Sequence, residues 1–214
     1  MELSKFNITS HLATVMMVIM MTITTVQVQA QEIYRAEGPS AAVQLRTNGL
    51  YDLVLCPNVG IEVQTDLGLA WQLDYIGAWW NTQKKNRYFS NYALQTELRY
   101  YFASPKMNFP YTGHHAGAYF QLATYDFEFG GKGFQCRDLD NSIGFGLSYG
   151  YSKAISRRFS LDFTLGIGYF TSKYTVYEPS NDWYKAVGYK KLTWFGPTKA
   201  EVTLVWNLNK NNNR

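Results

Sequence analysis

The chain has 214 residues and a formal net charge of +4; 46% of its residues are hydrophobic and 17% are aromatic. This charge is too small and too dispersed to favour nucleic-acid binding. Beyond residue 30, no uncharged apolar stretch approaches the roughly 20 residues of a transmembrane helix, which excludes a helical membrane protein.

The N-terminal segment has the pattern of a secretory signal peptide. Lys5 provides a positive start, residues 12–26 form an uncharged apolar run, and a VQA segment ends at Ala30. A transmembrane anchor is the alternative, but the run is short for a span of roughly 20 residues. We therefore predict a signal peptide over residues 1–30, an N-terminal extension over residues 31–42, and a mature chain of 214 − 30 = 184 residues.

From residue 43 onward, apolar and polar residues alternate in segments that turn residues separate. The alternation is clearest near the end of the chain, where Ala200, Val202 and Leu204 alternate with polar neighbours. Such a pattern gives a β-strand one apolar and one polar face. The segments predict eight strands, over residues 43–55, 59–65, 69–80, 88–102, 114–127, 142–152, 159–172 and 198–208. This even number predicts a closed up-and-down barrel over residues 43–208, followed by a polar tail over residues 209–214.

The distribution of charge distinguishes a membrane barrel from a soluble one. A soluble, lipocalin-type barrel would turn its aromatic residues inward and carry Lys and Glu outside, whereas here the polar face has few charges, of both signs, and several glycines. Because an eight-stranded barrel has room inside only for side chains, paired charges fit its lumen. We predict an all-β, eight-stranded antiparallel up-and-down transmembrane β-barrel with apolar side chains facing lipid. The predicted interior polar network comprises Arg46, Glu62, Asp74, Glu97, Arg99, Asp162, Lys199 and Glu201.

The connections between predicted strands indicate the orientation of the barrel. With the N-terminus in the periplasm, the turns on that side fall at residues 66–68, 103–112 and 153–158. Three of the four opposite connections are expected as long outer loops, as in outer-membrane barrels. These loops are predicted at residues 81–87, 128–141 and 173–197.

Several segments resemble one family. They are NGLYDLVLCPNVGIE, the AWW and RY pairs around Trp79 and Tyr88, TGHHAGAY, TYDFEFGGKGFQ, RRFSLDFTLGIGYF and WFGPTKAEVTLVW. Together they cover residues 48–206 and are similar to domain of unknown function 3575, a family of small outer-membrane proteins from Bacteroidota. The resemblance implies an outer-membrane β-barrel, often encoded near fimbrial-type surface genes, and brings no established activity and no catalytic residues.

The adjacent pair His114 and His115 is the strongest candidate for chemistry. Outer-membrane lipid-modifying enzymes use a His with Ser or Asp near the outer leaflet. This pair opens a predicted strand at the periplasmic rim, which is the wrong end for that reaction. We therefore expect the imidazoles to cap a turn or to bond to interior polar groups, and we predict no catalytic residue.

A basic cluster with aromatic neighbours is expected at the outer rim. The candidate outer-loop contact comprises Trp79, Trp80, Lys84, Lys85 and Arg87. It suits lipopolysaccharide phosphates or a protein partner, and simple solvation of the loop is equally favoured.

The two cysteines carry no metal-binding pattern. Cys56 and Cys136 show neither CxxC nor Cys/His spacing, so we expect no metal site and no cofactor. In an exported protein they either form one disulfide or remain inert thiols.

These patterns favour a non-enzymatic outer-membrane protein with a structural or surface-interaction role, and the family resemblance implies a link to fimbria-like assemblies. The expected partners are outer-membrane lipid, lipopolysaccharide and surface-appendage or other envelope proteins, and no nucleic acid. Two alternatives remain at this stage. A lipid-modifying enzyme requires a nucleophile within hydrogen-bond reach of a His, and a narrow pore requires a continuous water-filled lumen.

Overall fold

The computed structural model describes residues 41–82, 87–102, 110–129, 131–180 and 183–208. The predicted signal peptide, most of the predicted extension and the polar tail lie outside these residues. The described elements are β1 (Ala41–Asn48), α2 (Gly49–Leu53), β2 (Asn58–Thr65), β3 (Leu69–Thr82), β4 (Arg87–Tyr101), β5 (Gly113–Phe129), β6 (Gly133–Cys136), η2 (Leu139–Asn141), β7 (Ser142–Ala154), β8 (Phe159–Ser180) and β9 (Trp183–Asn207). No helix in this part of the chain is long and apolar enough to cross a membrane.

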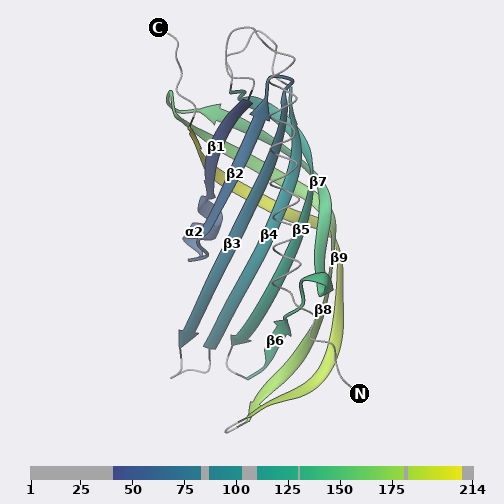
Figure 1. The fold of residues 1–214 in the computed structure, drawn as a ribbon. Helices are drawn as coiled ribbons and strands as arrows, with labels where there is room; N and C mark the ends of the chain where they lie inside the picture. Colours follow the sequence, from purple (N-terminus) through teal and green to yellow (C-terminus); the bar gives the residue numbers. More distant parts are fainter. Residues whose placement is uncertain (1–40, 83–86, 103–109, 130, 181–182, 209–214) are drawn as a thin grey trace, which may run out of the picture. The chain divides into compact units, whose positions relative to one another are not determined.

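The strands close into a ring (Figure 1). Antiparallel pairing runs in sequence order from β1 to β5, continues through β7, β8 and β9, and returns to β1, where Leu45 pairs with Trp206. The short strand β6 lies between β5 and β8 and precedes β7 in the same direction, so nine described strands fill eight positions of the ring. The predicted eight-stranded, antiparallel up-and-down barrel is confirmed.

The two ends of the barrel differ in their connections (Figure 1). At one end, which we call the short-turn end, residues 66–68 join β2 to β3 and residues 155–158 join β7 to β8. At the opposite, long-hairpin end, β3 and β4 extend together, and β8 and β9 extend farthest. The predicted loops at residues 128–141 and 173–197 were wrong, because most of these residues continue the strands as paired hairpins.

β1 and β2 are short, so the barrel wall extends less far toward the long-hairpin end at these two strands. β1 pairs with β9 only up to the Asn48–Thr203 pair, whereas β8 accompanies β9 to Trp183. Among the described residues, β9 therefore has no strand partner on its other edge from Trp183 to Val202. The helical turn α2 lies in this gap, where a Cβ on Gly49 would lie 3.3 Å from the carbonyl oxygen of Val202.

The predicted strand over residues 43–55 was wrong in its second half. The side chain of Asn48 accepts a hydrogen bond from the Leu50 backbone N–H (3.1 Å), which caps α2 and ends β1. Leu55 then adopts a φ of +60°, a left-handed conformation that turns the chain toward β2. Leu53 at the end of this helical turn, and Val54 and Leu55 after it, are therefore exposed.

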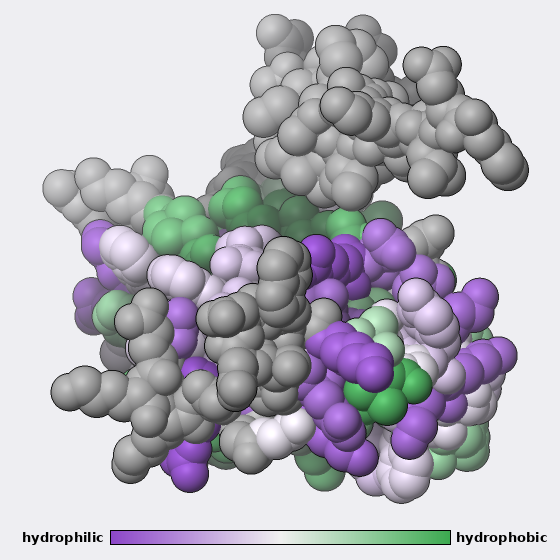
Figure 2. Space-filling view, turned by 90° about the horizontal axis from the view of Figure 1, so that it is seen from below, coloured by the Kyte–Doolittle hydropathy of each residue, from purple (hydrophilic) through white to green (hydrophobic). Residues whose placement is uncertain are grey.

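Side chains on the strands alternate between the lumen and the exterior. Leu98, Leu147 and Leu165 are 56%, 71% and 71% exposed, whereas Glu97 and Asp162 are each 1% exposed. The predicted direction of the apolar residues is confirmed: they cover the outside, and polar side chains fill the inside. Figure 2 looks onto the long-hairpin end and shows hydrophilic residues over much of it, with apolar residues toward its margins.

Candidate functional site: the charged lumen and the outer rim

The lumen contains a cluster of buried ion pairs. Arg46 on β1 forms an ion pair with Glu62 on the neighbouring strand β2. Its guanidinium also lies 3.6 Å from Asp74, 3.4 Å from Glu201 and 3.9 Å from Asp162. One arginine thus joins carboxylates from four other positions of the ring.

Arg99 on β4 makes a second set of contacts in the same cluster. Its guanidinium nitrogens lie 2.9 Å from Glu97, 3.3 Å from Asp162, 3.5 Å from Glu62 and 3.4 Å from Glu201. Burial of an arginine is tolerated only where carboxylates compensate its charge. The shared carboxylates connect this set to that of Arg46, so the two arginines belong to one network.

Lys199 completes the cluster. Its ammonium pairs with Glu97 and lies 3.2 Å from Glu201. All eight residues of the predicted interior network therefore lie together in the lumen, with three basic and five acidic side chains. Neutral groups satisfy the remaining acceptors: Ser148 donates to Glu97 (2.5 Å) and Gln95 donates to Glu201 (2.8 Å).

Glycines on the lumen face make room for these side chains. The Tyr119 side chain projects toward Gly146, Gly166 and Gly168, where a Cβ would lie within 2.9 Å of its hydroxyl or ring. The Lys199 ammonium lies 5.4 Å from the ring centroid. A small cavity of about 10 Å³ lies near Tyr51 of α2 and Asp74. A cavity of this size holds at most one water molecule.

The two histidines have structural partners at the short-turn end. The Nε2 atom of His115 lies 2.8 Å from Asp162 Oδ2, and the ring is fully buried. The exposed His114 bonds through Nδ1 to the Tyr149 hydroxyl (2.9 Å), and its ring packs against Tyr151. Neither partner is a serine or cysteine nucleophile. His115 bonds to an interior polar group as expected, whereas the exposed His114 bonds to a tyrosine on the outer face.

The candidate outer-loop contact is only partly described. Lys84 and Lys85 lie outside the described residues. Trp79, Trp80 and Arg87 are exposed at the long-hairpin end, and the Trp79 indole donates to the Tyr88 hydroxyl (3.1 Å). Since consecutive strand residues point to opposite faces, Trp79 and Trp80 do not share one surface.

Cys56 and Cys136 are buried thiols, and no disulfide joins them in the described structure. Cys56 packs against Ile76 and Ala78 near α2. Of the two alternatives, one disulfide or two thiols, the structure has two thiols. No cluster of three or more His, Cys, Asp or Glu side chains placed to hold a metal ion occurs among the described residues.

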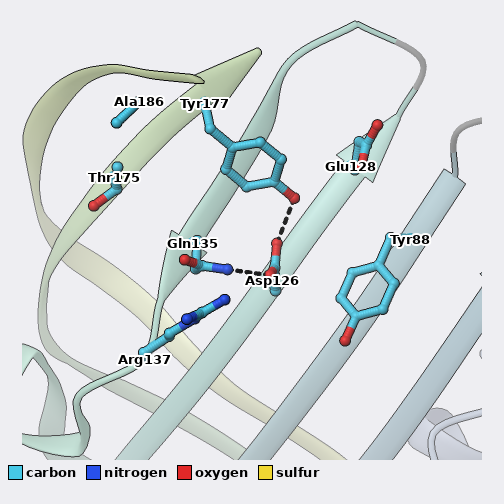
Figure 3. A pocket seen from close by; sticks show the side chains of 8 residues that line it. All are labelled: Tyr88, Asp126, Glu128, Gln135, Arg137, Thr175, Tyr177 and Ala186. Carbon is cyan, nitrogen blue, oxygen red and sulfur yellow. Dashed lines mark hydrogen bonds between the residues drawn. The ribbon is translucent and has the colours of Figure 1, made fainter. Parts of the chain in front are cut away.

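The sequence patterns did not reveal a pocket at the long-hairpin end. It has a volume of about 320 Å³ and lies over β4, β5, β6, β8 and β9 (Figure 3). Its lining residues are Tyr88, Asp126, Glu128, Gln135, Arg137, Thr175, Tyr177 and Ala186. The spacing of Asp126 with Glu128 puts this pair on one strand face, but only the pairing of several strands brings it together with Gln135 on β6 and with Tyr177 on β8.

A closed barrel with an apolar exterior and a packed, charged lumen has the inside-out build of membrane-spanning β-barrels. The chain belongs to the family described as "Protein of unknown function (DUF3575)", whose model matches residues 14–208. The resemblance noted in the sequence is thereby confirmed. The chain matches none of the curated proteins. Among solved structures it is similar to the crystal structure of Neisserial surface protein A (NspA), with 16% identity and a TM-score of 0.36, over 80% of this chain and 98% of that chain.

Proposed function

We propose that the protein is a non-enzymatic β-barrel of the outer membrane with its long-hairpin end at the cell surface. The inside-out distribution of side chains is the observation that carries this proposal. In water, the exposed Leu147 and Leu165 would each lose the free energy of burial, about 1.5–3 kcal/mol per side chain, whereas acyl chains satisfy them in a bilayer. Export would follow from the signal peptide predicted over residues 1–30.

The β8–β9 hairpin supports a surface-interaction role. It projects beyond the other strands, and the edge of β9 from Trp183 to Val202 has no strand partner in the described structure. An open edge carries unpaired backbone N–H and C=O groups, which pair with an added extended strand. The proposed partner is therefore an extended strand of a surface-appendage or other envelope protein, as in fimbria-like assemblies.

The packed lumen favours a surface-interaction role over a pore, and the contacts of the histidines favour it over a lipid-modifying enzyme. A pore needs a continuous water path, but the ion pairs of Arg46, Arg99 and Lys199 cross the interior. A lipid-modifying enzyme needs a nucleophile beside a His at the outer leaflet, but both histidines bond to other groups at the short-turn end.

The test is photo-cross-linking in intact cells. A benzophenone amino acid at Tyr189, which is 85% exposed on β9, should form an adduct with one envelope protein. The matched control at Leu165 should yield lipid adducts only. A lack of protein adducts at Tyr189 would overturn the interaction role, and recovery of the mature protein in the soluble fraction would overturn the membrane location.

A further inference from the structure

The rim pocket opens on the outer face of the barrel. β4 and β5 pair without a register shift from Leu98–Ala118 to Tyr88–Glu128. Because residues an even number of positions apart share a face, Tyr88 and Glu128 lie on the same side as the outward-facing Leu98. The pocket therefore lies beyond the apolar belt, on the surface that continues toward the membrane interface.

The Tyr177 ring and Gly133 build one wall of this pocket. Gly133 pairs with Glu128 on one side and with Tyr177 on the other, and a Cβ at Gly133 would overlap the Tyr177 ring. The ring therefore lies across the glycine, and its hydroxyl donates to Asp126 (2.6 Å; Figure 3). Gln135 also donates to Asp126, so both carboxylate oxygens of Asp126 have protein partners.

Glu128 differs from Asp126 in this respect. Glu128 is 3% exposed as a residue and lines the pocket. The described residues give its carboxylate no hydrogen bond or ion pair, although its oxygens are not among the fully buried atoms without a partner. Burial and the neighbouring charge of Asp126 raise the pKa of Glu128. A carboxylate in a pocket wall, with no cation beside it among the described residues, is a suitable partner for a ligand with positive charge.

We propose that the pocket binds a primary ammonium group, with Glu128 as its ion-pair partner. An ammonium presents three donors, and carboxylate and phenol oxygens are suitable acceptors. The rings of Tyr88 and Tyr177 line the pocket, and aromatic rings attract cations.

The opposite side of the pocket suggests a larger ligand. Arg137 lies away from Glu128, beyond Asp126 (Figure 3). A guanidinium binds phosphate well, so a phosphoethanolamine group has an acceptor for its ammonium and a donor for its phosphate. A lipid headgroup and a free amine share this chemistry; the headgroup source rests on the proposed membrane location.

Titrations of the folded mature protein in detergent micelles test the site without reference to the membrane role. Ethanolamine and O-phosphoethanolamine should both bind by calorimetry, and inorganic phosphate alone should not. Glu128→Gln should weaken both by at least about tenfold, as removal of one partner of a buried charge pair does. Arg137→Gln should weaken only O-phosphoethanolamine. The matched control is Glu178→Gln, an exposed acid that pairs with Lys132, and it should bind both amines as the wild type does.

A lack of amine binding, or equal binding by folded Glu128→Gln, would overturn the proposal, and so would binding of inorganic phosphate alone. Near-ultraviolet circular dichroism of each variant verifies that its fold is intact. Native mass spectrometry from nanodiscs then distinguishes the sources: retained phosphatidylethanolamine, with no retention of phosphatidylcholine, supports the headgroup. Retention of neither lipid, with amine binding intact, supports a free amine.

Discussion

Arg99 on β4 and Glu201 on β9 lie on opposite sides of the ring, four strand positions apart in either direction, yet their Nη2 and Oε2 atoms are 3.4 Å apart. Two side chains thus bridge the whole lumen. Since the same residues also contact Arg46 and Lys199 through shared carboxylates, the interior is a continuous layer of charge pairs. This layer connects strands that share no backbone hydrogen bonds.

Arg99→Met should strongly destabilise the barrel. The substitution leaves Glu62, Glu97 and Asp162 in the lumen with less positive charge, and breaking a buried pair in this way costs about 3–5 kcal/mol. The measurement is the urea midpoint of the folded form in micelles, followed by tryptophan fluorescence. Arg157→Gln removes an exposed arginine at the short-turn end and should change stability by no more than about 0.5 kcal/mol. Equal midpoints for the two variants would contradict a stabilising role of the cluster.

Leu165→Arg should reduce folding into lipid bilayers. Leu165 is 71% exposed within the apolar belt, and arginine on a lipid-facing position near the midplane costs about 2–4 kcal/mol. The comparison is Tyr189→Arg, which lies on the projecting part of β9 and should fold as the wild type does. Folding yields into vesicles of a single phospholipid measure both. Efficient folding of Leu165→Arg would be evidence that this face does not contact lipid.

Gly168→Ala should destabilise the barrel through overlap in the lumen. A Cβ there would overlap the backbone carbonyl of Phe145, which cannot move aside as a flexible side chain does. Overpacking of this kind costs roughly 1–3 kcal/mol. Gly188→Ala provides the control because no atom lies within 4 Å of a Cβ at that position. Thermal unfolding monitored by circular dichroism should separate the two variants, and a wild-type transition for Gly168→Ala would refute this packing.

The two cysteines should titrate as thiols. Without reductant, the unfolded mature protein should react with two equivalents of a thiol reagent, since no disulfide joins Cys56 to Cys136. Burial raises the pKa of the Cys56 thiol, so its thiolate fraction at a given pH is lower than that of a free cysteine, whose pKa is about 8.5. Its alkylation in the folded protein should therefore accelerate only at a higher pH than that of a model thiol. Fewer than two thiols after unfolding would demonstrate a disulfide.

The sequence was sufficient to predict the barrel and its interior because both depend on alternation. A strand between lipid and a narrow lumen needs apolar residues on one face and polar residues on the other. The polarity of Leu98 and Arg99 therefore predicts that Leu98 faces outward and that Arg99 faces the lumen. The eight network residues follow from the same rule. Alternation failed at residues 49–55, where the Asn48 cap favours a helical turn over a strand.

The hairpin beyond the belt was harder to predict. Both faces of β9 are exposed there, so residues such as Lys190 and Lys191 show no apolar alternation although they pair with Tyr174 and Lys173. The rim pocket depends on this hairpin, because Tyr177 must reach across Gly133 to Asp126. The pattern of residues along a single strand cannot predict this contact, because β5, β6 and β8 form it together.

A membrane-spanning barrel requires its outward-facing apolar side chains to contact lipid. Spin labels attached at Leu147→Cys and Leu204→Cys, in a background with both native cysteines replaced by alanine and reconstituted in vesicles, measure this directly. We expect frequent collisions with dissolved oxygen and few with a water-soluble nickel chelate at both positions, and the reverse at Tyr189→Cys. Ready access of the nickel chelate to the labels at positions 147 and 204 would contradict it.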